Sequence, residues 1–150
     1  MYSARHVDST RLVALDTLAS AQANGTEATA QKVTHLLNYC ATHPDAVVRF
    51  YASEMCLNIH SDASYLSELK AKSRSSGFNF LSDFPKEPTK KPDPDATPPP
   101  ENGAVHVHSA IMKPVLASAA EAETGSVFFT CQEGTPIRTT PHKNCPLHTT

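Results

Sequence analysis

The sequence has no tryptophan, and tyrosine and phenylalanine together make up only 7% of its 150 residues. Large aromatic side chains supply much of the buried surface of most cores, so we expect a thin core within one ordinary domain. No apolar run approaches the about 20 residues that cross a membrane, and no apolar stretch of signal-peptide type opens the chain. These absences predict an intracellular protein, cytoplasmic or nuclear, without a membrane partner.

Cysteine is sparse, and charge of one sign is nearly balanced by the other. The four cysteines form no C-x-x-C pair, which favours neither a structural zinc site nor a disulfide framework. We expect reduced thiols, three of them on apolar faces in the core. The net charge of -2 attracts nucleic acid only weakly, so binding would require a local basic patch or a metal ion.

Proline is abundant and clustered, with seven of the twelve prolines between residues 85 and 102. The same segment carries Lys, Asp, Glu and Thr, a composition that cannot pack and that favours polyproline II. We predict a disordered Pro-rich loop at 85–102 between two strands; a ligand for a Pro-reading module is the alternative. A tail over 134–150, also containing prolines, is predicted to be disordered.

Two amphipathic helices are predicted before this loop, over residues 8–22 and 27–42. Side-chain oxygens of Asp8 and Thr26 can cap their N-termini, and apolar residues recur at helical spacing. Strands are predicted at 46–52 and 55–61, forming one hairpin, and at 77–84 and 103–111, forming a second. A short strand or its approach is predicted at 113–117.

The strand at 55–61 runs into Ser61-Asp62-Ala63-Ser64, which places one carboxylate at its end. Asp62 either caps a turn or holds a metal ion beside a rigid backbone. A helix over 118–133 follows later, and Glu123 shares a face with the small residues Ala119, Ala120 and Ser126. A carboxylate on a packing face requires a partner, so Glu123 is either a rim residue in water or a metal ligand facing Asp62.

Two further groups of polar residues have two interpretations each. The basic run Lys70, Lys72 and Arg74 is either a solvated loop or a set of phosphate contacts. His106 and His108 lie two residues apart in a predicted strand, on the same face, and such a pair could bind zinc. No Cys or acidic residue lies at convincing ligand spacing from the two histidines.

Taken in order, these motifs resemble the ribonuclease H region of copia-type retrotransposon polyproteins. The resemblance covers roughly residues 2–133. It rests on Ser61-Asp62-Ala63, on the helix opening Ser118-Ala-Ala-Glu-Ala-Glu123, and on Leu37-Asn38-Tyr39, which resembles the helix linking polymerase to nuclease. The resemblance implies an α/β fold: a partial ribonuclease H-like fold of antiparallel strands plus one helix, preceded by two amphipathic helices.

The resemblance also implies a chemistry, which is hydrolysis of RNA in an RNA–DNA hybrid during reverse transcription. Carboxylates in such sites hold two Mg²⁺ ions about 4 Å apart, and Asp62 and Glu123 match the first two acids of the family. Lys70, Lys72 and Arg74 would contact nucleic acid. The implied partners are the hybrid and the polymerase part of the same polyprotein.

The chain also departs from the family pattern. The third acid of the family lies in an Asp-Asn motif, whereas this sequence has no Asp-Asn and no aspartate after Asp95. We therefore expect connection-like elements over 1–54, a truncated ribonuclease H-like domain over 55–133, weak or absent Mg²⁺ binding, and no nuclease activity in isolation. The alternatives are an integrase-type core, a non-catalytic interaction module acting through the Pro-rich loop or the N-terminal helices, and a histidine-based zinc protein.

Overall fold

The computed structural model describes residues 2–83 and 100–144. Most of the predicted Pro-rich loop, and Cys145, lie outside these ranges. In chain order the elements are α1 (Tyr2–His6), η1 (Ser9–Arg11), α2 (Leu12–Ala21), η2 (Gln22–Asn24), α3 (Glu27–Thr42), β1 (Cys56–Glu68), β2 (Lys72–Ser82), β3 (Ala104–Ile111) and α4 (Ala119–Asn144). None of the described helices is long and apolar enough to cross a membrane.

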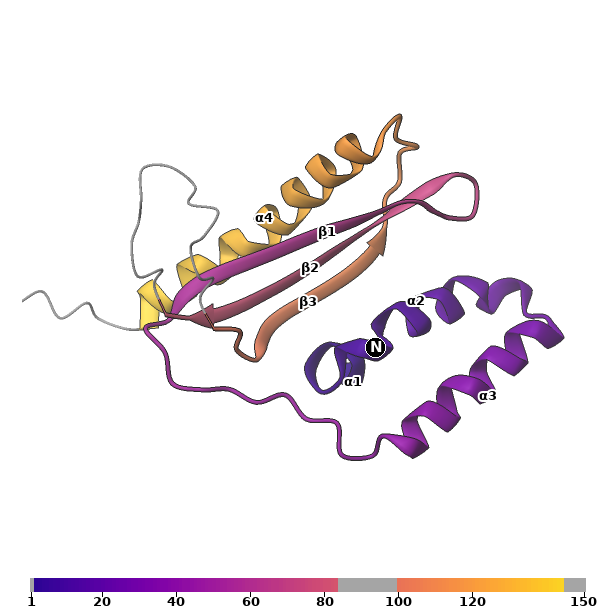
Figure 1. The fold of residues 1–150 in the computed structure, drawn as a ribbon, viewed down its shortest axis with the longest axis horizontal. Coiled ribbons are helices and arrows are strands. Elements are labelled where there is room, and N and C mark those ends of the chain that lie inside the picture. Colours follow the sequence, from indigo (N-terminus) through magenta and orange to yellow (C-terminus); the bar gives the residue numbers. More distant parts are fainter. Residues whose placement is uncertain (1, 84–99, 145–150) are drawn as a thin grey trace, which may run out of the picture.

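The three strands form one antiparallel sheet in the order β1-β2-β3. Helix α4 packs along one face, over β1 and β2, while α1 and α2 lie against β3 (Figure 1). Helix α3 contacts α2 and is set away from the sheet. The predicted α/β class is therefore confirmed, with helices preceding antiparallel strands and one helix following them.

The two N-terminal helices follow their local sequence signals closely. The Asp8 carboxylate accepts a hydrogen bond from the Thr10 backbone N–H, which begins the helical stretch at η1. Thr26 caps α3 in a reciprocal capping box with Thr29, which satisfies two of the N–H groups left free at a helix start. Both helix predictions are confirmed, since caps and periodicity are properties of short segments.

Three strand predictions are wrong. Residues 46–52 form no strand, because β1 pairs with β2 through a turn at 69–71 rather than with the segment before it. The link at 53–54 also lacks the Asn-Gly type of residues that close a tight hairpin. Strand β1 continues through 61–64 to Glu68, so Asp62 lies inside a strand rather than at its end. Residues 113–117 form a loop.

Helix α4 is longer than the sequence predicts. The helix continues through Gly134 and Pro136 to Asn144, so residues 134–144 are helical rather than a disordered tail. Gly134 is a point of close approach, because a Cβ there would lie 2.6 Å from Ile59 Cδ1 on β1. Gly134 was expected to end the helix, but its missing side chain instead allows α4 to pack closely against the sheet.

The two faces of the sheet differ in chemistry. The α2 face holds a small apolar cluster of Ala4, Leu12 and Val107. The α4 face is lined largely by short polar side chains, and its fully buried members are Ser73, Asn79, Ser126 and Thr130. The cysteine prediction is corrected here: Cys40 and Cys56 are half-buried and Cys131 is exposed, all three as free thiols.

Two glycines of α4 provide a matched pair of substitutions. Gly125→Ala is expected to raise the free energy of unfolding by about 0.5–1 kcal/mol, the gain in helix propensity. Its Cβ would lie 3.6 Å from Met112 Cε, an ordinary contact. Gly134→Ala is expected to lower the free energy of unfolding by about 1 kcal/mol, because the contact with Ile59 outweighs that gain. Urea denaturation followed by circular dichroism measures both; equal changes would mean that α4 does not rest on β1 at Gly134.

Candidate functional site

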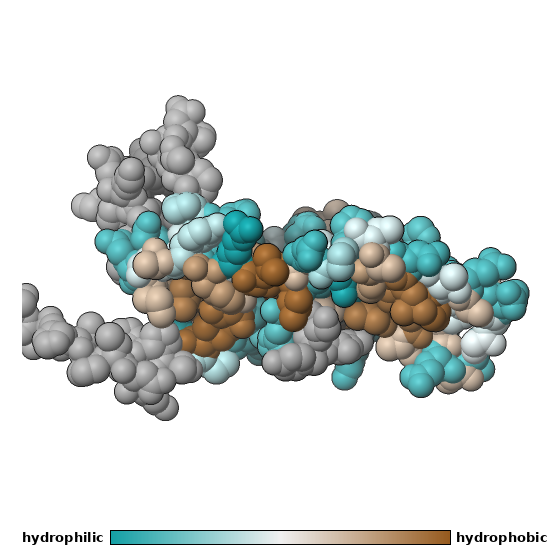
Figure 2. All heavy atoms as spheres, turned by 90° about the horizontal axis from the view of Figure 1, so that it is seen from below, coloured by the Kyte–Doolittle hydropathy of each residue, from teal (hydrophilic) through white to brown (hydrophobic). Residues whose placement is uncertain are grey.

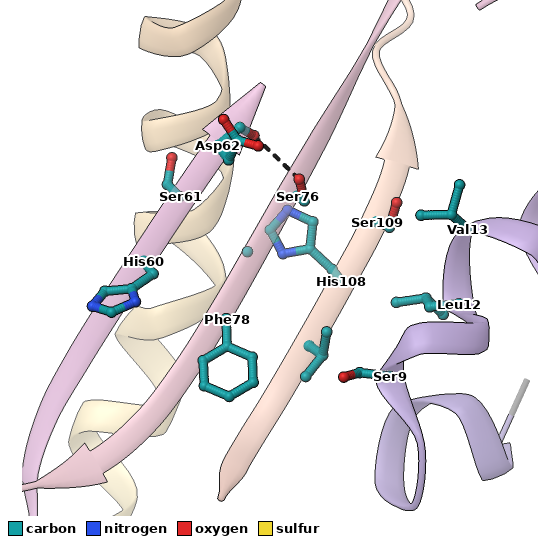
Figure 3. A pocket seen from close by; sticks show the side chains of 12 residues that line it. Ser9, Leu12, Val13, His60, Ser61, Asp62, Ser76, Phe78, His108 and Ser109 are labelled. Carbon is teal, nitrogen blue, oxygen red and sulfur yellow. Dashed lines mark hydrogen bonds between the residues drawn. The ribbon is translucent and has the colours of Figure 1, made fainter. Parts of the chain in front are cut away.

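Asp62 lies in the middle of β1, opposite Ser76 of β2, and its side chain is exposed. Alternation along the strand places Asp62 on the α2 face, since Leu57 and Ile59 face α4 at Gly134. It borders a cavity of about 240 Å³ together with Leu12, Val13 and other residues of that face (Figure 3). Among the residues that the structure describes, Asp62 is the only carboxylate lining this cavity.

Glu123 is exposed on α4 and does not lie on its packing face. The buried residues of the helix over 119–139 are Ala122, Ser126, Thr130 and Gly134, spaced by four, so the packing face is centred one residue earlier than predicted. The Ser126 hydroxyl donates a 2.6 Å hydrogen bond to the Asp62 carbonyl oxygen, so α4 crosses β1 at this residue. The Asp62 side chain nevertheless lies on the opposite face of the sheet from α4.

The residues present do not fit a two-magnesium site. Such a site needs several carboxylates converging on one point, whereas Asp62 and Glu123 are separated by the sheet. Within residues 2–83 and 100–144, neither acid belongs to a group of three or more side chains close enough to share an ion. The geometry thus gives Asp62 and Glu123 no common metal.

The basic run divides into two kinds of residue. Lys70 is exposed in the β1–β2 turn with a φ of 62°, and Lys72 is half-buried at the start of β2. Arg74 is buried at 5% exposure and donates to Glu68 Oε1 at 2.6 Å and to Asp16 Oδ2 at 2.8 Å. Arg74 therefore joins α2 to the sheet and is not available to a phosphate, while Lys70 and Lys72 remain accessible.

A different group of side chains converges on the α4 face. His106 and His108 of β3 and Glu133 of α4 have nitrogen and oxygen atoms within 4.8 Å of one another. Glu133 Oε2 lies 2.7 Å from His108 Nδ1 and 3.6 Å from His106 Nδ1. The His108 side chain is 7% exposed, and those of His106 and Glu133 are 32% and 45% exposed, so the group opens to solvent on one side.

A chain of hydroxyl groups lies behind His108. Its Nε2 is 3.2 Å from Ser75 Oγ, which is 2.8 Å from Ser126 Oγ, and Ser126 donates to the Asp62 carbonyl oxygen. That carbonyl can only accept, so each hydroxyl donates toward it and His108 Nε2 carries the proton.

The charge state of His108 follows from its surroundings. Burial lowers the pKa of the His108 imidazole, and although the Glu133 carboxylate raises it, the charges of His106 and Arg5 reinforce the burial effect, so the net shift is downward. The burial of this imidazole thus disfavours its charged form. Beside it lies a cleft of about 380 Å³ lined in part by Ser75, Met112, Phe129 and Glu133.

The histidine pair is visible in the sequence, but Glu133 as its neighbour is not. Glu133 follows His108 by 25 residues and comes from another element. The helical repeat could have indicated it: Glu133 lies eleven residues after Ala122, which places it on the same side of the helix as Ala122, Ser126 and Thr130.

Searches of protein-family models, curated proteins and solved structures found no match to this chain.

Proposed function

We propose that this chain is part of a copia-type retrotransposon polyprotein, spanning the polymerase–nuclease connection and the first part of a ribonuclease H-like domain. The observation that carries the proposal is the order of elements, three consecutive antiparallel strands followed by a helix on the sheet. Asp62 is in the first of these strands, and Glu123 is in the first turns of the helix. That order is what the sequence resemblance implies.

The N-terminal helices support the connection part of the proposal. No residue of α3 is buried, and Val33 and Leu37 of its apolar stripe are 40% and 62% exposed. Figure 2, which views the side of the molecule where α3 lies, shows apolar side chains gathered in surface patches. An apolar stripe of this kind suits a contact with the polymerase part of the same polyprotein, inside the cell.

The proposed function does not include catalysis by this chain alone. Hydrolysis by two metal ions requires carboxylates that hold both ions against one phosphate. Asp62 has no acidic neighbour in its cavity, and Glu123 is on the far side of the sheet. The chain would instead contribute strands, a helix and the accessible Lys70 and Lys72 to association with an RNA–DNA hybrid.

The test uses a fluorescently labelled RNA–DNA hybrid and the purified chain with Mg²⁺ or Mn²⁺. We expect no cleavage, and binding at low salt that is tighter for the hybrid than for a DNA duplex of the same sequence, because the 2′-hydroxyl and hybrid shape distinguish them. Lys70→Glu/Lys72→Glu is expected to weaken hybrid binding several-fold, because each lysine removed from a phosphate reduces the electrostatic term. Fluorescence anisotropy measures the affinity.

The control for the lysines is Lys32→Glu/Arg49→Glu, an equal change of charge at two exposed residues outside the sheet. Equal loss of binding in both double variants, or no preference for the hybrid, would contradict the proposal. Cleavage that disappears in Asp62→Asn and in Glu123→Gln would contradict the proposal that the chain alone is inactive. It would show that other groups complete the metal site.

A further inference from the structure

We propose that His106, His108 and Glu133 form a binding site for a single Zn²⁺ ion at the edge between β3 and α4. This site is separate from the acids that the resemblance singles out, and it does not depend on the proposed function. Two imidazole nitrogens and one carboxylate oxygen are a donor set that zinc accepts, with a fourth position left for water. Among residues 2–83 and 100–144 this is the only cluster of three such ligands.

The backbone arranges the three ligands without large rearrangement. Residues two apart on a strand point to the same face, so β3 presents both imidazoles toward α4. Tetrahedral zinc bonds of about 2.0–2.1 Å place ligand atoms roughly 3.3 Å apart. The observed separations of 2.7 and 3.6 Å from Glu133 Oε2 bracket that value. Small rotations of the side chains would bring all three atoms onto one ion.

The two Nδ1 atoms of the site have no hydrogen-bond partner in the part of the chain that the structure describes. Nδ1 of His106 and Nδ1 of His108 are both buried and make no hydrogen bond of regular geometry, although Glu133 is close. The Glu133 Oε2 atom lies 2.7 Å from His108 Nδ1 and 3.6 Å from His106 Nδ1. A cation held between these three atoms would give each of them a partner.

The surroundings complete the features expected of a zinc site. Metal-bound histidines commonly donate their other N–H to a fixed acceptor, and Ser75 Oγ, held by Ser126, occupies that place for His108. Gly77 leaves room for the ring, since a Cβ there would lie 2.4 Å from His108 Cε1. The cleft of about 380 Å³ beside His108 and Glu133 gives water or a small ligand access to the fourth position.

The experiment is a Co²⁺ titration of the full chain after removal of metal with a chelator. Tetrahedral Co²⁺ absorbs visible light far more strongly than the aqueous ion, so the spectrum reports geometry as well as binding. We expect one equivalent to produce this absorption and Zn²⁺ to abolish it by competition. Glu133→Gln and His106→Gln/His108→Gln are expected to lose it, and Ser75→Ala to bind about 10-fold more weakly.

His60→Gln is the matched control, because His60 is an exposed histidine of β1 on the other face of the sheet. It should retain the full cobalt spectrum. Circular dichroism checks that each variant is folded. If the variant that changes the buried His108 unfolds, the cobalt spectrum of Glu133→Gln decides the test, because the Glu133 side chain is 45% exposed. An octahedral spectrum in the unmodified chain, or a tetrahedral one that survives in folded Glu133→Gln, would overturn the proposal.

Discussion

Arg74→Met is expected to lower the free energy of unfolding by about 3 kcal/mol, because it leaves two partly buried carboxylates without their counter-charge. The guanidinium is 5% exposed and binds Glu68 at the end of β1 and Asp16 of α2. Burial alone would lower the pKa of Arg74, but Glu68 and Asp16 more than offset it and raise the pKa. The cation is therefore present at every accessible pH.

The measurement is urea denaturation monitored by circular dichroism, with Lys72→Met as the control. Lys72 is in the same strand and forms no ion pair with the described part of the chain. Its substitution should therefore change the free energy of unfolding by less than about 0.5 kcal/mol. Arg74→Lys should fall between the two, because an ammonium cannot reach both carboxylates in the planar arrangement of a guanidinium. Equal effects of Arg74→Met and Lys72→Met would show that the ion pairs do not hold α2 on the sheet.

Gly77→Ala is expected to lower the free energy of unfolding by about 2–3 kcal/mol, as overpacking of a filled interior does. Its Cβ would lie 2.4 Å from Cε1 and 2.7 Å from Nδ1 of His108, and 2.7 Å from Thr130 Cγ2. Both neighbours are buried, and Thr130 is part of α4 itself, so neither can move away freely. Displacement of the His108 ring should also abolish the tetrahedral cobalt spectrum.

Gly25→Ala is the control, since nothing lies within 4 Å of a Cβ at that position and its φ is -63°. This substitution should leave stability unchanged or raise it by a few tenths of a kcal/mol, through the unfolded chain. The same urea titration compares the two variants. A Gly77→Ala protein as stable as Gly25→Ala, with metal binding intact, would mean that the ring is not held against Gly77.

The run Ser61-Asp62-Ala63-Ser64 has small polar residues of the kind that end strands, yet β1 passes straight through it. Small side chains are required there because the hydroxyl of Ser126 approaches the β1 backbone to 2.6 Å. A composition that favours a turn in isolation thus serves a close helix–sheet contact, which no local pattern reveals.

The positions of Glu123 and Glu133 relative to the sheet also could not be predicted from local sequence. The sequence places both on one helix, but the apolar residues of this helix are not gathered along one side, so its buried face could not be oriented from its pattern. The buried face lies one residue earlier in the helix than predicted. Glu123 is therefore exposed to solvent, while Ala122, Ser126 and Thr130 pack against the sheet. The pairing of β2 with β3 then decides which strand residues Glu133 meets.

The sequence by itself determined the features whose causes lie within a few residues. The Asp8 cap of η1, the capping box of α3, the extent of the two helical stretches, the strand character of 77–82 and of β3, and the shared face of His106 and His108 all follow from local chemistry. Only the tertiary structure decided that Arg74 is buried, that Asp62 and Glu123 lie apart, and that Glu133 meets the histidines. Those outcomes depend on strand register and on how closely a helix can approach a sheet, which residues distant in sequence set jointly.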